Sequence, residues 1–234
     1  MWTNVYAYAT NRGYDFYYEG QQGQNGTPRS NYPVETVDWL DCLKWCNARS
    51  QQAGLIPCYY TDAGYTHVFT NDFAGFPSLA VYQSLSCNGY RLPTEAEWEK
   101  AARGGLNGRR FPWGNLISAG QAQYAACTNC DFGYDLGPNH NPTGPSPASA
   151  LDVNGYGLYD MVGNLTEWCW DVYATSYGQP TPINPTGPDG PSTVRVVRGG
   201  NWVNYAFLGR CAYRNYGDVL NANYIIGFRC VRGL

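Results

Sequence analysis

The stretch that decides the fold runs Asn154-Gly155-Tyr156-Gly157-Leu158-Tyr159-Asp160-Met161-Val162-Gly163-Asn164-Leu165-Thr166-Glu167-Trp168. Glycine and aromatic residues recur in it, and the whole chain shares this character, with 28 glycines, 21 tyrosines, 15 prolines and 8 tryptophans in 234 residues. Charged residues make up only 14% of the chain. This composition predicts a loop-rich fold held together by aromatic packing and turns, with few long surface helices.

Three further segments, placed before and after this stretch, form a set with it. They are Pro33-Val34 with Val37, Trp39 and Cys46; Arg91-Leu92-Pro93-Thr94-Glu95-Ala96-Glu97-Trp98-Glu99 with Ala101-Ala102-Arg103-Gly104; and Arg195-Val196 with Arg198-Gly199-Gly200, closed by Gly227-Phe228-Arg229. The tripeptide Pro112-Trp113-Gly114 lies between them. In these motifs and their order, the chain resembles the formylglycine-generating enzyme, or sulfatase-modifying factor, family over nearly its whole length.

The resemblance implies a fold. It implies an α+β protein of the C-type-lectin-like, formylglycine-generating-enzyme-like kind, loop-rich, with a small twisted antiparallel sheet and flanking helices. It also implies a single domain over residues 1–234. The strand that usually opens the family's domain is expected to be missing, because residue 1 already lies near the first helix.

Local patterns predict where regular structure lies. Apolar spacing predicts helices over residues 2–12, 34–53 and 94–103. A capping box of Thr94 and Glu97 supports the third of these helices. The strand-like segments are 58–60, 67–69, 195–198 and 227–231. Residues 14–33 and 106–155 have no sustained period, which predicts irregular chain there.

Charge and hydropathy exclude several classes of partner. The formal net charge is −3 with no basic run, so nucleic acid is not expected as a partner. No apolar stretch is long enough to span a bilayer.

We expect a protein of the cell surface or extracellular space, with a lipid anchor on the missing N-terminal segment as one option, or a component of a phage particle.

The nine cysteines leave the redox compartment open. Cys127 and Cys130 are spaced as a redox pair, half of a zinc site or a local disulfide. Cys42 and Cys46 share one face of the predicted helix, which favours buried packing. Zinc is not expected, because the two histidines lie far apart in the sequence.

The resemblance also locates the family's catalytic cysteines, which bind copper(I) as soft thiolates. They follow the Arg-Gly-Gly turn, five positions apart, and here fall on Asn204 and Gly209. Neither side chain holds copper(I) or forms a disulfide, so no copper and no catalysis by this route are expected. Cys211 is out of register with these positions and is assigned to packing.

The C-terminal residues 195–229 resemble the variable region made by diversity-generating retroelements in phage and treponemal proteins. These elements randomise adenines in codons of the AAY type, which cannot produce Lys, Glu, Gln, Met or Trp, and none of these five occurs from Val203 to Ile225. The expected diversified, ligand-binding positions are Val203, Asn204, Tyr205, Phe207, Leu208, Gly209, Asn215, Tyr216, Gly217, Asp218, Val219, Asn223, Tyr224 and Ile225.

The predicted function is therefore non-catalytic binding of an unknown protein or surface ligand through this segment. Exposed aromatic side chains on an irregular segment supply a large contact area at low entropic cost. Two alternatives stay open: an oxidoreductase of the formylglycine-generating kind that uses a different site, and a scaffold of the same family with no diversified surface.

The resemblance finally implies a structural calcium ion. Its ligands would be the main-chain carbonyls of Asp160, Gly163 and Leu165 and the side chain of Glu167. Oxygen ligands from a turn and one carboxylate suit a hard cation. A second calcium loop of the family is not expected, because Ala126 stands where that loop has an asparagine.

Overall fold

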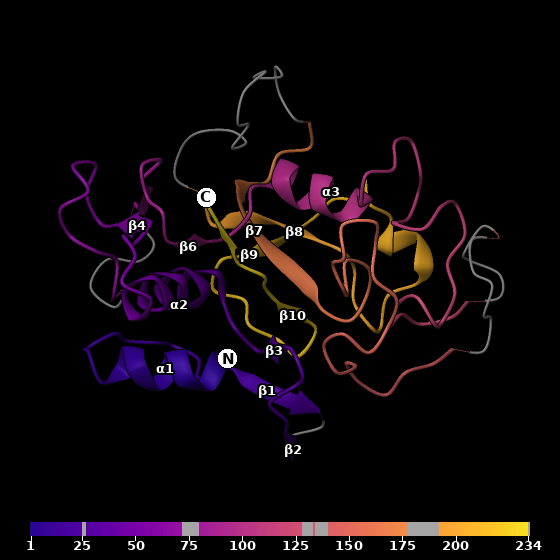
Figure 1. Ribbon diagram of the computed structural model, residues 1–234, viewed down its shortest axis with the longest axis horizontal. Coiled ribbons are helices and arrows are strands. Elements are labelled where there is room, and N and C mark those ends of the chain that lie inside the picture. The colour runs from indigo at the N-terminus through magenta and orange to yellow at the C-terminus, as the bar shows by residue number, and fades with distance from the viewer. Residues whose placement is uncertain (25–26, 72–79, 128–132, 134–139, 177–191, 234) are drawn as a thin grey trace.

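The computed structural model describes residues 1–24, 27–71, 80–127, 133, 140–176 and 192–233 (Figure 1). Within these residues the α helices are α1 (Trp2–Thr10), α2 (Trp39–Gln52) and α3 (Glu95–Arg103). The strands are β1 (Gln21–Gln24), β2 (Thr27–Pro28), β3 (Val34–Glu35), β4 (Tyr59–Tyr60), β5 (Tyr82–Gln83), β6 (Tyr90–Arg91), β7 (Thr166–Val172), β8 (Val194–Arg198), β9 (Asn215–Asp218), β10 (Ile226–Gly227) and β11 (Val231–Arg232). None of the helices is long and apolar enough to cross a bilayer.

Helix α3 forms where its capping box predicts. The Thr94 hydroxyl accepts a hydrogen bond from the Glu97 main-chain N–H, and the Glu97 carboxylate accepts one from the Thr94 N–H. The helix ends at Gly104, whose φ of +55° suits a residue without a Cβ. The paired caps satisfy main-chain donors that the first turn leaves open.

Helix α2 is shorter than the predicted 34–53. It begins at Trp39 because the Asp38 carboxylate caps it, accepting from the Asp41 N–H at 2.7 Å. The preceding residues Val34 and Glu35 instead pair with β1 as strand β3. Part of the segment 14–33, predicted to be irregular, instead forms strands β1 and β2 of the ladder β2-β1-β3.

The central sheet has the strand order β10-β7-β8-β9, with β7 and β8 antiparallel, β8 and β9 antiparallel, and β10 and β7 parallel. Helix α3 lies against it (Figure 1). The predicted strand 195–198 is β8, whereas the predicted strand 227–231 is two short strands, β10 and β11, of which β11 pairs with β6. Of the predicted strand 67–69, only an isolated bridge from Val68 to Tyr60 forms.

Aromatic rings fill the core between α2 and the sheet. Trp170 stacks between Trp39 and Tyr59, with ring centroids 5.3 and 5.2 Å apart. Cys42 and Cys46 are buried free thiols in this core, as their helical spacing predicts. A loop-rich chain of this kind gains much of its stability from such large buried rings.

Disulfides occur in the irregular parts of the chain. Cys58 and Cys87 form a bridge that closes 29 residues of chain. Cys127 is also disulfide-bonded, while Cys130 lies outside the described residues. Closing a loop of this length restricts the unfolded chain and stabilises the folded one.

A chain of buried ion pairs joins α3 to the sheet and to the C-terminal segment. The guanidinium of Arg198, which is buried, lies 3.4 Å from the Glu95 carboxylate and 2.6 Å from that of Glu99. It also donates to the main-chain carbonyls of Cys211 and Tyr213. Glu95 in turn holds Arg214 through two hydrogen bonds of 2.6 and 2.7 Å.

Replacing Arg198 should therefore be strongly destabilising. We expect Arg198→Met to lower the free energy of unfolding by about 3–5 kcal/mol, because it removes the buried cation that Glu95 and Glu99 share and leaves two carbonyls without their donor. Urea denaturation followed by circular dichroism measures this.

The control is Arg103→Met, which removes the partner of Glu99 at the edge of the same cluster. This pair is partly exposed, so its loss should cost no more than about 1 kcal/mol. Equal losses in the two variants would contradict a special role for the buried guanidinium.

Candidate ligand-binding surface

The predicted variable positions fall into three groups along the C-terminal segment. The first surrounds the short 3-10 helix η1 (Ala206–Gly209), the second lies on strand β9, and the third is the turn at residues 223–225. Strand β9 was not predicted, since this part of the chain was expected to be irregular. It is the edge strand of the central sheet and pairs only with β8 there.

The first group has exposed side chains on a fixed main chain. Val203 and Tyr205 are 39% and 42% exposed. The Asn204 carbonyl accepts a hydrogen bond of 2.8 Å from the Ala125 N–H, and the Asn204 N–H donates to the Asn201 carbonyl. Because these bonds use main-chain atoms, they hold the loop whatever side chains it carries.

The third group is held in the same way and touches the first. Tyr224 is 56% exposed, and its ring lies 5.8 Å from that of Trp202. The Asn223 carbonyl accepts from the Thr36 N–H, and the Ile225 carbonyl from the Thr166 N–H. Trp202 is itself partly exposed and packs beside this ring.

The second group lies on β9. Tyr216 is exposed, and its ring packs 4.9 Å from that of Tyr173, which follows β7. Asn215 and Asp218 are also exposed. Pairing with β8 fixes the main chain of these residues, so their side chains project from an anchored edge.

Three of the predicted positions do not belong to an exposed surface. Val219 is buried. A Cβ at Gly209 would lie 2.6 Å from Val162, and a Cβ at Gly217 would lie 2.5 Å from the Trp168 ring. These positions accept little change without movement of their neighbours, so they are part of the scaffold.

The free thiols in the described part of the chain are held toward their protonated form. Burial raises the pKa of Cys211 to about 11 and raises the pKa of Cys230, with the pKa of Cys42, Cys46 and Cys169 raised well above the ordinary value. Metal binding and nucleophilic attack need the thiolate. Cys211 lies in the core beside α3, as its assignment to packing predicted.

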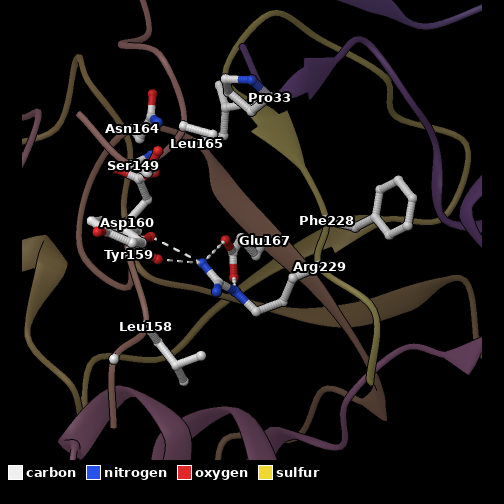
Figure 2. Close-up of a pocket in the computed structure, with 12 residues that line it drawn as sticks. Pro33, Ser149, Leu158, Tyr159, Asp160, Asn164, Leu165, Glu167, Phe228 and Arg229 are labelled. Carbon is white, nitrogen blue, oxygen red and sulfur yellow. Dashed lines mark hydrogen bonds and ion pairs between the residues drawn. The ribbon is translucent and has the colours of Figure 1, made fainter. Parts of the chain in front are cut away.

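The predicted calcium loop is engaged by an internal cation (Figure 2). The Glu167 carboxylate accepts hydrogen bonds from Arg229 at 2.5 and 2.6 Å and from the Trp98 indole N–H at 2.7 Å. The same guanidinium donates to the Asp160 carbonyl at 3.2 Å. Two of the predicted calcium ligands, the Asp160 carbonyl and the Glu167 carboxylate, therefore already contact a cation of the chain.

The calcium ion itself stays a prediction of the resemblance. Gly163 and Leu165 are buried in the same loop, and Leu165 lines a cavity of about 420 Å³ with Asp160 and Glu167. Across the described ranges, no group of three or more His, Cys, Asp or Glu side chains gathers as a metal site. A calcium ion bound through Glu167 would have to displace Arg229.

Fold and surface together define a class: an irregular α+β scaffold that presents exposed side chains from an anchored C-terminal segment. Residues 3–234 match the sulfatase-modifying factor enzyme 1-like domain, and the chain belongs to this family. It is 32% identical over 222 residues to the formylglycine-generating enzyme of Bos taurus, an alignment that covers 93% of this chain and 57% of that protein. The chain thus spans little more than half the length of this relative.

Two solved structures share the fold. The variable protein 1 of Treponema denticola is 26% identical with a TM-score of 0.71, covering 98% of this chain and 79% of that one. CarF is 25% identical with a TM-score of 0.76, covering 100% of this chain and 82% of that one. The predicted family and the predicted α+β, loop-rich fold are confirmed.

The tight contact at Gly209 gives a direct test of which positions belong to the scaffold. Gly209→Ala should lower the free energy of unfolding by about 1–3 kcal/mol, because the new methyl group overlaps Val162. Thermal or urea unfolding measures the change.

The matched control is Gly120→Ala, whose Cβ would meet no atom within 4 Å. It should change stability by no more than about 0.5 kcal/mol. A Gly209→Ala protein as stable as the Gly120→Ala protein would show that position 209 is free to vary after all.

Proposed function

We propose that this chain is a non-catalytic ligand-binding protein whose C-terminal surface has been diversified by a retroelement. The observation that carries the proposal is the combination of a main chain anchored by framework hydrogen bonds with exposed side chains at Val203, Tyr205, Tyr216 and Tyr224. The similarity to the Treponema denticola variable protein 1 supports the same interpretation.

The anchoring explains how such a surface tolerates change. Hydrogen bonds from Ala125, Thr36 and Thr166 reach main-chain carbonyls of the variable segment, and β9 is held by its ladder with β8. A substitution on an exposed position of this kind removes no buried contact, so its effect on stability is small. Binding specificity is then free to change while the fold is kept.

The chemistry of the exposed side chains suits binding to a protein or surface ligand. Tyrosine offers a large, rigid contact area with a hydroxyl that both donates and accepts hydrogen bonds. Asn204 and Asn223, both partly exposed, flank Tyr205 and Tyr224 and add adaptable polar contacts. The surface is therefore of the same chemical kind as an antibody paratope. As part of the proposal, we assign the protein to a cell surface or a phage particle.

Catalysis by the family's copper route is not part of the proposal. We assign the family's cysteine positions to Asn204 and Gly209, and the close contact of Gly209 with Val162 leaves no room for a thiol. The buried cysteines retain their protons at neutral pH because burial raises each pKa.

The diversification is tested in the surrounding DNA. We expect a near-copy of the codons for residues 195–229 close to the gene, differing from it only opposite adenines of the copy. Sequencing the flanking region measures this directly. Differences spread over all four bases, or no copy at all, would leave only a scaffold with a fixed surface.

The second candidate function is an oxidoreductase of the formylglycine-generating kind, which the 32% identity to the bovine enzyme favours. We expect the purified chain, supplied with copper(I) and a cysteine-containing peptide, to consume no oxygen above the rate of a protein-free control. The measurement is oxygen uptake with mass spectrometry of the peptide. Turnover that Cys211→Ala abolishes would overturn the proposal and assign catalysis to that thiol.

A further inference from the structure

A second cavity is built from residues near the N-terminus, which lie far from the variable segment in the sequence. It has a volume of about 420 Å³ and is formed by α1 and the strands β1, β2 and β3, which lie together in Figure 1. The residues that line it fall between Trp2 and Glu35. It is therefore built from chain outside residues 195–229, and the proposed ligand-binding function does not use it.

Glu35 is a buried carboxylate in the wall of this cavity. It lies on β3 opposite Gln21 of β1 and is only 7% exposed. Its Oε2 atom is buried and has no hydrogen-bond partner. A buried polar atom in this condition costs free energy, so an occupant that donates to it would be stabilised.

The cavity carries negative charge without a balancing cation. A second carboxylate, Glu19, is exposed at its rim, and no Lys or Arg is found among the described residues that line it. Desolvation by burial raises the pKa of Glu35 to about 7. The carboxyl group is therefore close to half ionised at neutral pH, and a nearby cation would favour the ionised form.

One wall is aromatic and held in place, next to polar lining residues such as Thr3 and Gln21. Trp2 stacks on Trp45 with ring centroids 5.7 Å apart, and its indole N–H donates to the Glu19 carbonyl at 2.9 Å. Gly20 has a φ of +69°, and a Cβ there would lie 2.8 Å from the Trp2 ring, so the main chain approaches the indole closely. Tyr6 completes the wall on α1.

We propose that this cavity binds a primary ammonium group carried on an alkyl chain. The ammonium would donate to Glu35, and the methylene groups would lie against Trp2 and Tyr6. A compact cation with three donors suits a single buried carboxylate. A divalent metal would need several oxygen ligands, and the described residues gather no group of three or more acids, histidines or cysteines.

Binding should depend on pH with a defined sign. The ammonium pairs with the ionised carboxylate, so affinity should approach its full value about one pH unit above 7 and fall about tenfold per pH unit well below it. Among the described residues, the titratable groups that line the cavity are Glu35, Glu19 and Tyr6. The pKa of Tyr6 is raised above its ordinary value by burial, so Tyr6 stays neutral throughout this range.

The test is isothermal titration of the whole chain with n-butylammonium chloride and with Nα-acetyl-lysine amide at pH 8, and again at pH 5. n-Butanol is the uncharged control. We expect both ammonium probes to bind at pH 8, butanol not to bind, and binding to be lost at pH 5. Tighter binding of acetyl-lysine amide would indicate a lysine side chain as the natural occupant, and tighter binding of butylammonium a free amine.

Two matched variants separate the buried carboxylate from the exposed one. Glu35→Gln should weaken binding at least about tenfold, because it removes the charge with little change in shape. Glu19→Gln should weaken it less than about threefold, because that carboxylate is exposed to solvent. Circular dichroism shows whether each variant is folded.

The proposal is overturned if neither ammonium probe binds the wild-type chain at pH 8, if butanol binds as well as butylammonium, or if affinity is equal at pH 5 and pH 8. It is also overturned if folded Glu35→Gln binds as tightly as the wild type. The pH series uses the wild-type chain alone, so the test stands even if the variant fails to fold. Oxygen uptake and the template DNA are independent of every one of these outcomes.

Discussion

The buried guanidinium of Arg198 is the constraint on which the described structure depends. It meets two carboxylates of α3, Glu95 and Glu99, and donates to carbonyls of the chain at residues 211 and 213. A charge buried in this way persists only where every partner is in place. The interaction therefore locks the motif at 91–104 to the Arg-Gly-Gly turn and to the start of the C-terminal segment, although these lie far apart in the sequence.

Contacts with the scaffold separate the buried positions of the C-terminal segment from the exposed ones. Main-chain hydrogen bonds and the β8–β9 ladder hold its course. Gly209, Gly217 and Val219 contact the scaffold, which leaves little room for a larger side chain. Tyr205, Tyr216 and Tyr224 are exposed. Sequence position alone does not distinguish these two sets, because a codon that a retroelement can change specifies a buried residue as readily as an exposed one.

The sequence predicted the parts of the fold that have local signals. The Thr94–Glu97 box marked the start of α3, and long motifs identified the family. Strand β7 was missed because it is buried along most of its length and shows no simple alternation. Strand β9 was missed because Asn215-Tyr216-Gly217-Asp218 has the composition of a turn. The pairing of Glu167 with Arg229 joins residues far apart in the chain, and no local pattern reveals it.

Glu35 differs from three other carboxylates of the interior, each of which is paired with a cation. Glu95 and Glu167 are paired with arginine, and Asp41 with Lys44 at 2.9 Å. Each of these carboxylates recovers in Coulomb energy and hydrogen bonds much of what it loses in hydration. Glu35 Oε2 has no such donor, and its pKa rises accordingly. A carboxylate oxygen left without a donor beside a cavity carries a cost that an occupant with a positive charge would remove. The chemistry of that occupant follows from the residue, not from the family to which the chain belongs.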